Sequence, residues 1–165
     1  HAPTRGLMGY TSRFLTLTKG TGVINRIFHG YGKFEGEMDG RKNGALISMS
    51  TGKAVAFAIF NLQARGEMFV THNDPVYEGM IVGLTPKPGD MIINVMKGKQ
   101  LTNMRTQGTD ENVVLTPVRQ MSIAEQLSML NTDEALEITP KSLRLRKAIL
   151  NPHDRKKSEK SGAAA

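Results

Sequence analysis

The residues best suited to chemistry lie between Lys97 and Glu111. The first thirteen residues of this segment hold three cations, several amide and hydroxyl side chains and no acid. This combination suits contacts to phosphate and sugar oxygens. About fifteen residues without a periodic pattern is also long for a connection, since most have about 4–6. We expect a ligand-contacting segment here, with an ordinary connecting loop as the alternative. Its cations are Lys97, Lys99 and Arg105, and its amides include Gln100 and Asn103.

Patterns for catalysis and metal binding are missing from the sequence. It has no cysteine and no G-x-x-x-x-G-K-[ST] loop, and Gly20-Thr21-Gly22 lacks the third glycine of a dinucleotide site. The histidines are scattered without ligand spacing. Most acids fall in expected turns and caps, so no paired-carboxylate site is indicated. We expect no catalytic residue, no metal and no cofactor, and a chain that is not an enzyme by itself. The histidines are His1, His29, His72 and His153.

The charge balance favours polyanionic partners. The chain has 165 residues, 39% of them hydrophobic, with a net charge of +7 and a pI near 9.8. Both ends are basic, whereas residues 122–139 contain no Lys or Arg. Nucleic acid is the first expected partner, and an anionic membrane surface the second. A basic solvated surface with no such partner is the alternative. With no apparent signal peptide or membrane span, we expect a cytoplasmic protein.

The hydrophobic pattern predicts an α+β fold that positions these side chains. A Ser122/Glu125 capping box marks one helix start. The final helix is ambiguous, because Leu143–Arg146 also alternates as a strand does. Helices are expected at 7–18, 51–65, 122–130 and 139–150, and strands at 21–28, 45–49, 68–70, 80–84, 91–96, 113–116 and 136–139.

These elements suggest two folded parts and a tail. We expect a partial α/β unit at residues 1–40, a compact mixed β-sheet domain with about three helices at 41–152, and a disordered basic tail at 153–165. One helix and one strand leave the strand edge at 21–28 open. Open edges pair with other strands, so we expect the first unit either to self-associate through residues 21–28 or to show fast amide exchange there.

Seven motifs, taken in order, resemble a known family. Their order and spacing closely resemble the C-terminal part of the TypA/BipA translational GTPases, over residues 3–152. Residues 3–38 resemble the second half of the ferredoxin-like domain V shared with elongation factor G. Residues 41–152 resemble the C-terminal domain peculiar to the family. The motifs are Pro3–Tyr10, Thr18–Gly22, Gly40–Gly44, Phe60–Gly66, Val76–Gly83, Lys99–Arg105 and Thr139–Lys147.

The resemblance implies a ribosome-associated GTPase that acts in translation under stress and in large-subunit assembly. The family's GTPase and β-barrel domains are not in this chain, so GTP and Mg²⁺ would belong to the rest of the parent protein. In the family, the C-terminal domain faces large-subunit rRNA and the acceptor end of A-site tRNA. One of its loops points toward the peptidyl-transferase region, and by motif order that loop is Lys97–Glu111.

The resemblance therefore implies an RNA-binding module in contact with the ribosome. We expect no membrane partner, because the basic final segment has only a weak apolar face. The alternative is a structural or protein-interaction domain, docking through Phe57, Phe60 and Phe69 on ribosomal proteins or on the parent G domain. The expected RNA-binding residues are Lys97, Lys99, Gln100, Asn103, Arg105, Lys141, Arg144, Arg146 and Lys147.

Overall fold

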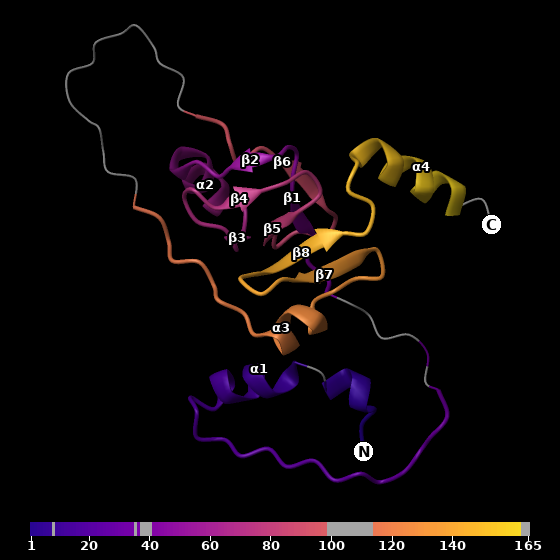
Figure 1. Cartoon of the computed structure of the whole chain (residues 1–165). Coiled ribbons are helices and arrows are strands. Elements are labelled where there is room, and N and C mark those ends of the chain that lie inside the picture. The colour runs from indigo at the N-terminus through magenta and orange to yellow at the C-terminus, as the bar shows by residue number, and fades with distance from the viewer. Residues whose placement is uncertain (8, 35, 37–40, 99–113, 163–165) are drawn as a thin grey trace, which may run out of the picture. The chain divides into compact units, whose positions relative to one another are not determined.

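The computed structural model describes residues 1–7, 9–34, 36, 41–98 and 114–162, and its contacts divide the chain into two compact units (Figure 1). The first unit comprises His1–Lys42 and Met121–Thr132, and the second comprises Asn43–Gln120 and Asp133–Ala165. Each unit has its own elements and is described separately.

The described residues of the first unit form three helices: η1 (Thr4–Leu7), α1 (Tyr10–Leu17) and α3 (Ile123–Ser128). Gly20, in the left-handed region at φ 81°, ends α1 by donating its N–H to the Leu15 carbonyl at 2.7 Å. The expected capping box of α3 is confirmed. Ser122 Oγ accepts from Glu125 N at 3.3 Å, and Glu125 Oε2 accepts from Ser122 N at 2.9 Å.

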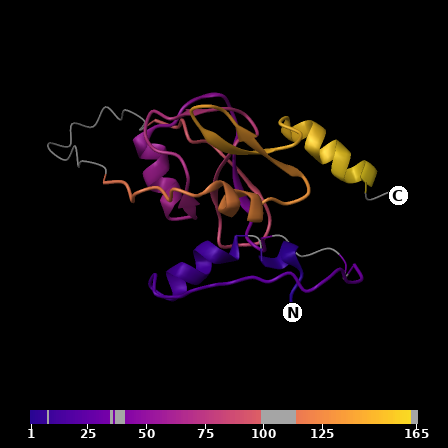
Figure 2. The ribbon, with the colours of Figure 1, turned by 60° about the horizontal axis from the view of Figure 1, so that its bottom comes forward.

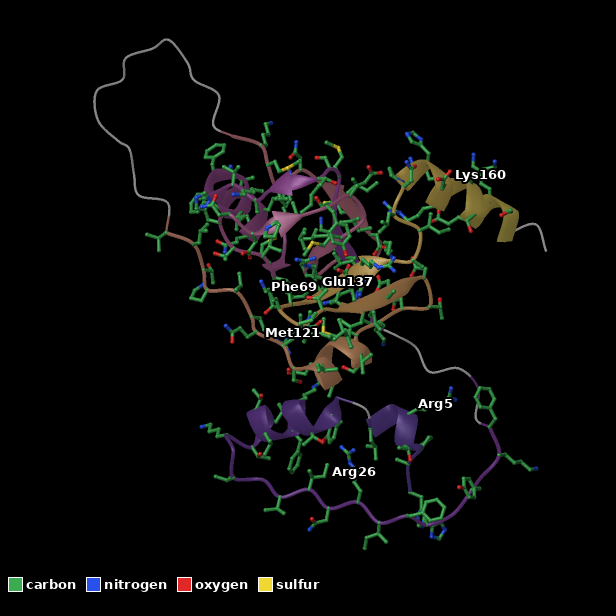
Figure 3. The ribbon with its side chains drawn as sticks, viewed as in Figure 1. Arg5, Arg26, Phe69, Met121, Glu137 and Lys160 are labelled. Atoms are coloured by element: carbon green, nitrogen blue, oxygen red, sulfur yellow. The ribbon has the colours of Figure 1, made fainter. Side chains whose placement is uncertain are left out.

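The strand expected at 21–28 is not formed, and this prediction was wrong. Among the described residues, the segment has no neighbouring strand to complete a ladder. Arg26 instead ties it to the helical side of the unit, donating to Thr11 Oγ1 at 2.6 Å and to the Leu7 carbonyl at 3.3 Å (Figure 3). Ile27 and Tyr31 are 93% and 100% exposed.

The second unit contains a mixed four-stranded sheet. With its helices, this sheet confirms the α+β class predicted from the sequence. Its strands are ordered β3 (Glu67–Met68), β5 (Ile81–Leu84), β1 (Ala45–Ser48) and β6 (Met91–Ile93). The pairs β3/β5 and β5/β1 are antiparallel, and β1/β6 is parallel. A strand with a neighbour on each side can be buried on both faces, and all four residues of β1 are buried.

Helix α2 (Ala56–Gln63) packs against the sheet and contributes to the apolar core. It buries Ala58, Ile59 and Leu62, and the last two join Leu46 and Val82 of the sheet in one apolar cluster. A second small sheet, β2 (Gly52–Lys53) with β4 (Pro75–Val76), is too short to be visible as a sequence pattern. The strand expected at 113–116 is absent at 114–116, and Val113 lies outside the described residues.

Strands β7 (Glu134–Ile138) and β8 (Leu143–Lys147) form an antiparallel hairpin, which corrects the helix expected at 139–150. The alternating apolar and basic residues of β8 favour a strand over a helix. Leu145 pairs with Leu136 across the hairpin, so both side chains can lie on the same face. Thr139 and Ser142 close the turn through backbone and side-chain hydrogen bonds of 2.9–3.0 Å. Strand β8 also lies against the start of β5, where Met80 bridges to Arg146 (Figure 1).

The tail expected to be disordered at 153–165 is helical up to Gly162, in α4 (Pro152–Gly162), and residues 163–165 lie outside the described residues. Asn151 caps it, because its Oδ1 accepts from His153 N at 2.8 Å. Proline at the first helical position and Asp154 in the first turn add to this start signal. The segment has too few apolar residues to predict a packed helix, but its local capping residues favour one. None of the helices in the described part of the chain is long and apolar enough to cross a membrane.

Candidate nucleic-acid interface

Most of the residues expected in the RNA-contacting segment cannot be placed. Lys99, Gln100, Asn103 and Arg105 lie outside the described residues. Lys97 is described, and it is exposed two residues after the buried Val95. Its position is compatible with a contact to an external anion.

The described residues on either side of this segment are anchored on one core. Before it, Met96 packs against the apolar cluster and donates its N–H to Asn94 Oδ1 at 2.9 Å. After it, Leu115 packs against the same cluster. The Gln63 side-chain amide then pairs with the Thr116 backbone in both directions, donating to its carbonyl at 2.9 Å and accepting from its N–H at 3.2 Å. The two ends are therefore held by the second unit.

The hairpin carries three of the expected cations on accessible positions. Lys141 is exposed in the turn between β7 and β8. Arg144 and Arg146 alternate with buried Leu145, so both lie on the opposite side of β8. Arg144 forms a 3.4 Å ion pair with Glu137, and Arg146 Nη1 donates to the Lys147 carbonyl at 3.3 Å. Glu137 therefore partly neutralises this group, and Lys141 is its most accessible member.

Glu137 also contacts Tyr77, a partly buried residue that packs against the apolar core. Its hydroxyl donates to Glu137 Oε2 at 2.6 Å. Burial, the hydrogen bond to Glu137 and the negative charge of Glu137 raise the pKa of Tyr77 to about 12, against an opposing effect of Arg146 and Arg144. The neutral phenol is therefore the form that the folded chain stabilises.

We predict that Tyr77 makes the chain lose stability in alkali. The folded state holds the phenolic proton more tightly than the unfolded chain, whose tyrosine titrates near pH 10, so stability falls as pH rises from about 10 to about 12. Allowing for partial exposure, we expect a loss of about 1–2 kcal/mol from this group. Urea unfolding at about pH 9 and about pH 11 should show a smaller difference for Tyr77→Phe than for the parent chain. Equal differences in the two proteins would contradict the assignment.

Lys147 is not an RNA contact, which corrects the sequence prediction. It is 2% exposed, and its Nζ meets Asp133 at 2.6 Å, Glu134 at 3.0 Å and Asp90. Burial lowers the pKa of Lys147, but hydrogen bonds to the three carboxylates outweigh it and raise the pKa above its ordinary value. Asp90 also accepts a hydrogen bond from the backbone N–H of Ala45 at 2.7 Å. Through Asp90, the Lys147 ammonium of β8 is therefore connected to the start of β1. An enclosed ammonium cannot reach a phosphate.

The expected RNA-binding residues omit the cations of α4, because the tail was expected to be disordered. The basic segment Lys141–Lys160 was expected to contact RNA only if Lys97–Glu111 does not. The signal that could have found these cations is the Asn151-Pro152 start with Asp154 in the first turn. Within the described part of the chain, no group of three or more His, Cys, Asp or Glu residues is arranged to hold a metal ion. The missed cations are Arg155, Lys156, Lys157 and Lys160.

The second unit is thus a small α+β domain with cations on a hairpin, beside a connecting segment and along a terminal helix. Residues 43–152 match the family described as TypA/BipA C-terminal domain. The chain belongs to the TypA/BipA family, as the order of its sequence motifs indicated, and carries the C-terminal domain of that family.

Relatives from several bacteria carry one description, large ribosomal subunit assembly factor BipA. The protein of Buchnera aphidicola is 48% identical over 158 residues, which are 95% of this chain and 26% of the relative. The Salmonella typhimurium protein is 46% identical and that of Haemophilus influenzae 42%, each over 96% of this chain and 26% of the relative. This chain therefore spans about a quarter of the length of these relatives.

Proposed function

We propose that this chain is the ribosome-binding C-terminal module of a translational GTPase. The observation that supports it most is the combination of TypA/BipA membership with exposed cations at Lys97 and Lys141. The relatives' description as large-subunit assembly factors supports the large subunit as the partner. In this proposal the module acts in the cytoplasm, in subunit assembly and in translation under stress.

The contacts we propose are electrostatic and directed at large-subunit rRNA and A-site tRNA. Lysine and arginine bind phosphates, whereas amide side chains can reach sugars and base edges. The proposed contacts are Lys97, Lys99, Gln100, Asn103, Arg105, Lys141, Arg144 and Arg146. GTP and Mg²⁺ would be bound by parts of the longer family protein outside this chain, so hydrolysis is not proposed for the module itself.

Salt dependence tests this proposal. The whole chain is titrated against purified large ribosomal subunits and against protein-free large-subunit rRNA at two salt concentrations. We expect binding to both, with affinity falling steeply as salt rises, because each phosphate contact releases counterions. Binding to intact subunits that does not change with salt, together with no binding to free rRNA, would contradict an RNA contact and favour protein docking.

The second candidate, docking on a ribosomal protein or on the parent G domain, has one supporting observation. Phe60 on α2 is 50% exposed, although its helix neighbours pack into the core. Exposed aromatic side chains are common anchors in protein interfaces. Phe57 and Phe69, the other two aromatic residues considered, are half-buried and serve the core better.

Phe60→Ala separates the two candidates. If RNA contacts dominate, we expect its affinity for large subunits to stay within about twofold of the parent chain. An interface anchor costs more than about 2 kcal/mol when truncated, or roughly thirtyfold in affinity. Such a loss, measured by equilibrium binding at moderate salt, would favour the protein-docking candidate.

A further inference from the structure

Helix α4 separates its charges by face. An α-helix advances about 100° per residue, so Lys156, Lys157 and Lys160 fall within roughly 100° of one another, with His153 among them. Asp154 and Glu159 lie about 110° to either side of the centre of this arc. We call the arc formed by Lys156, Lys157, Lys160 and His153 the lysine face.

The lysine face is exposed and makes no internal ion pair that would occupy it. Its four side chains are all exposed. Among the described residues, no carboxylate forms an ion pair with Lys156, Lys157 or Lys160. Lys156 and Lys160 are four residues apart, a spacing at which like charges repel and destabilise a helix. An anionic ligand would relieve this repulsion.

The opposite side of α4 fixes its first turn to the end of the hairpin. Arg155 Nη1 donates to the Ile149 carbonyl at 3.0 Å and to the Leu150 carbonyl at 2.6 Å. Asn151 caps the same turn. The rest of the helix projects from the hairpin (Figure 2). Lys160 lies near its far end (Figure 3). The lysines are therefore held in a defined row before any ligand binds, which reduces the entropy lost on binding.

We propose that the lysine face of α4 binds the phosphate backbone of RNA. This inference rests on the proposed function and extends it to a face of α4 that lies outside the contacts proposed there. Lys156 and Lys160 lie about 6 Å apart along the axis, so they can contact separate phosphates. The alternative anionic surface, a membrane, requires an apolar helix face, and the sequence of α4 contains no aliphatic or aromatic side chain apart from Pro152 and His153.

A charge-matched pair of variants of the whole chain tests the inference. One variant is Lys156→Gln, Lys157→Gln and Lys160→Gln. The control is Lys42→Gln, Lys53→Gln and Lys87→Gln, whose lysines are also exposed. Both lower the net charge equally, and glutamine keeps the helix propensity of lysine. Each protein is titrated against a fluorescent duplex RNA oligonucleotide over a range of salt concentrations, and helix content is checked by circular dichroism.

We expect the α4 variant to bind at least tenfold more weakly at low salt. Its slope of log K against log salt should be shallower by roughly 2–3 units, and that of the control by less than about 1. Equal losses of RNA affinity in the two variants, or no loss in the α4 variant, would overturn the inference. The proposed function would still stand if the parent chain binds large subunits. A parent chain that binds neither RNA nor subunits would overturn both. The same proteins are also titrated against phosphatidylglycerol vesicles. If the α4 variant loses affinity for the vesicles but not for RNA, the lysine face binds membranes and the RNA inference is overturned.

Discussion

Replacing Lys147 with methionine should lower the free energy of unfolding by about 3–5 kcal/mol. Removing one partner of a buried ionic group leaves the other charge without compensation. Here the Glu134 carboxylate, whose side chain is 0% exposed, would stay buried without the Lys147 ammonium. Asp90 and Asp133 are more exposed and can recover hydration. Urea unfolding followed by circular dichroism at neutral pH measures the loss.

Two further variants make this result specific. Arg146→Met changes the neighbouring cation on the other side of β8 and should cost less than about 1 kcal/mol. Adding Glu134→Gln to Lys147→Met removes the buried negative charge and should restore part of the loss. If Lys147→Met proved as stable as Arg146→Met, the buried ionic group would have no structural role. Since the pKa of Lys147 is raised, its contribution is complete below about pH 10.5 and disappears as pH rises further.

The second large effect is expected on RNA binding, from Lys97→Ala, Lys99→Ala and Arg105→Ala together. Loss of up to three phosphate contacts should make the slope of log K against log salt shallower by roughly 2–3 units. The deficit in affinity for large subunits or rRNA should be largest at low salt. Lys97 is exposed, and the other two lie outside the described residues, so their role rests on the sequence.

A control with the same numbers of lysine and arginine changes keeps this test specific. Lys42→Ala, Lys53→Ala and Arg65→Ala remove two exposed lysines and one exposed arginine elsewhere in the chain. We expect a smaller change in slope for the control and an unchanged melting temperature for both. An unchanged affinity in the first variant would refute the proposed contact and shift the RNA surface to α4 and the hairpin.

Elements with local signals could be predicted from the sequence. The Ser122/Glu125 capping box and the Gly20 helix end depend on residues within a few positions of each other, and both appear in the structure. The apolar runs at 45–49 and 80–84 were predicted as strands because each is short and bounded by turn residues, and both contain a buried strand. Family membership could also be predicted, since ordered motifs do not require any knowledge of contacts.

Features that depend on distant partners could not be predicted. The alternation of β8 is compatible with a helix or a strand until β7 pairs with it. Residues 21–28 are rich in Val and Ile, as strands are, but find no partner strand among the described residues. Lys147 was assigned to the surface by its residue type. Its burial depends on carboxylates 57, 14 and 13 positions away, at Asp90, Asp133 and Glu134. The RNA-binding set therefore contained one residue that stabilises the fold.

The reciprocal hydrogen bonds between Gln63 and Thr116 have a consequence for the design of variants. The side-chain amide acts as an additional peptide group, so the chain after the long connection is fixed to α2 without needing a neighbouring strand. Met96 and Leu115 fix both ends on the same core. Closure entropy grows only with the logarithm of loop length, and doubling the number of residues between the ends costs about 0.6 kcal/mol. The second unit can therefore serve as a platform for grafted segments of other lengths and sequences.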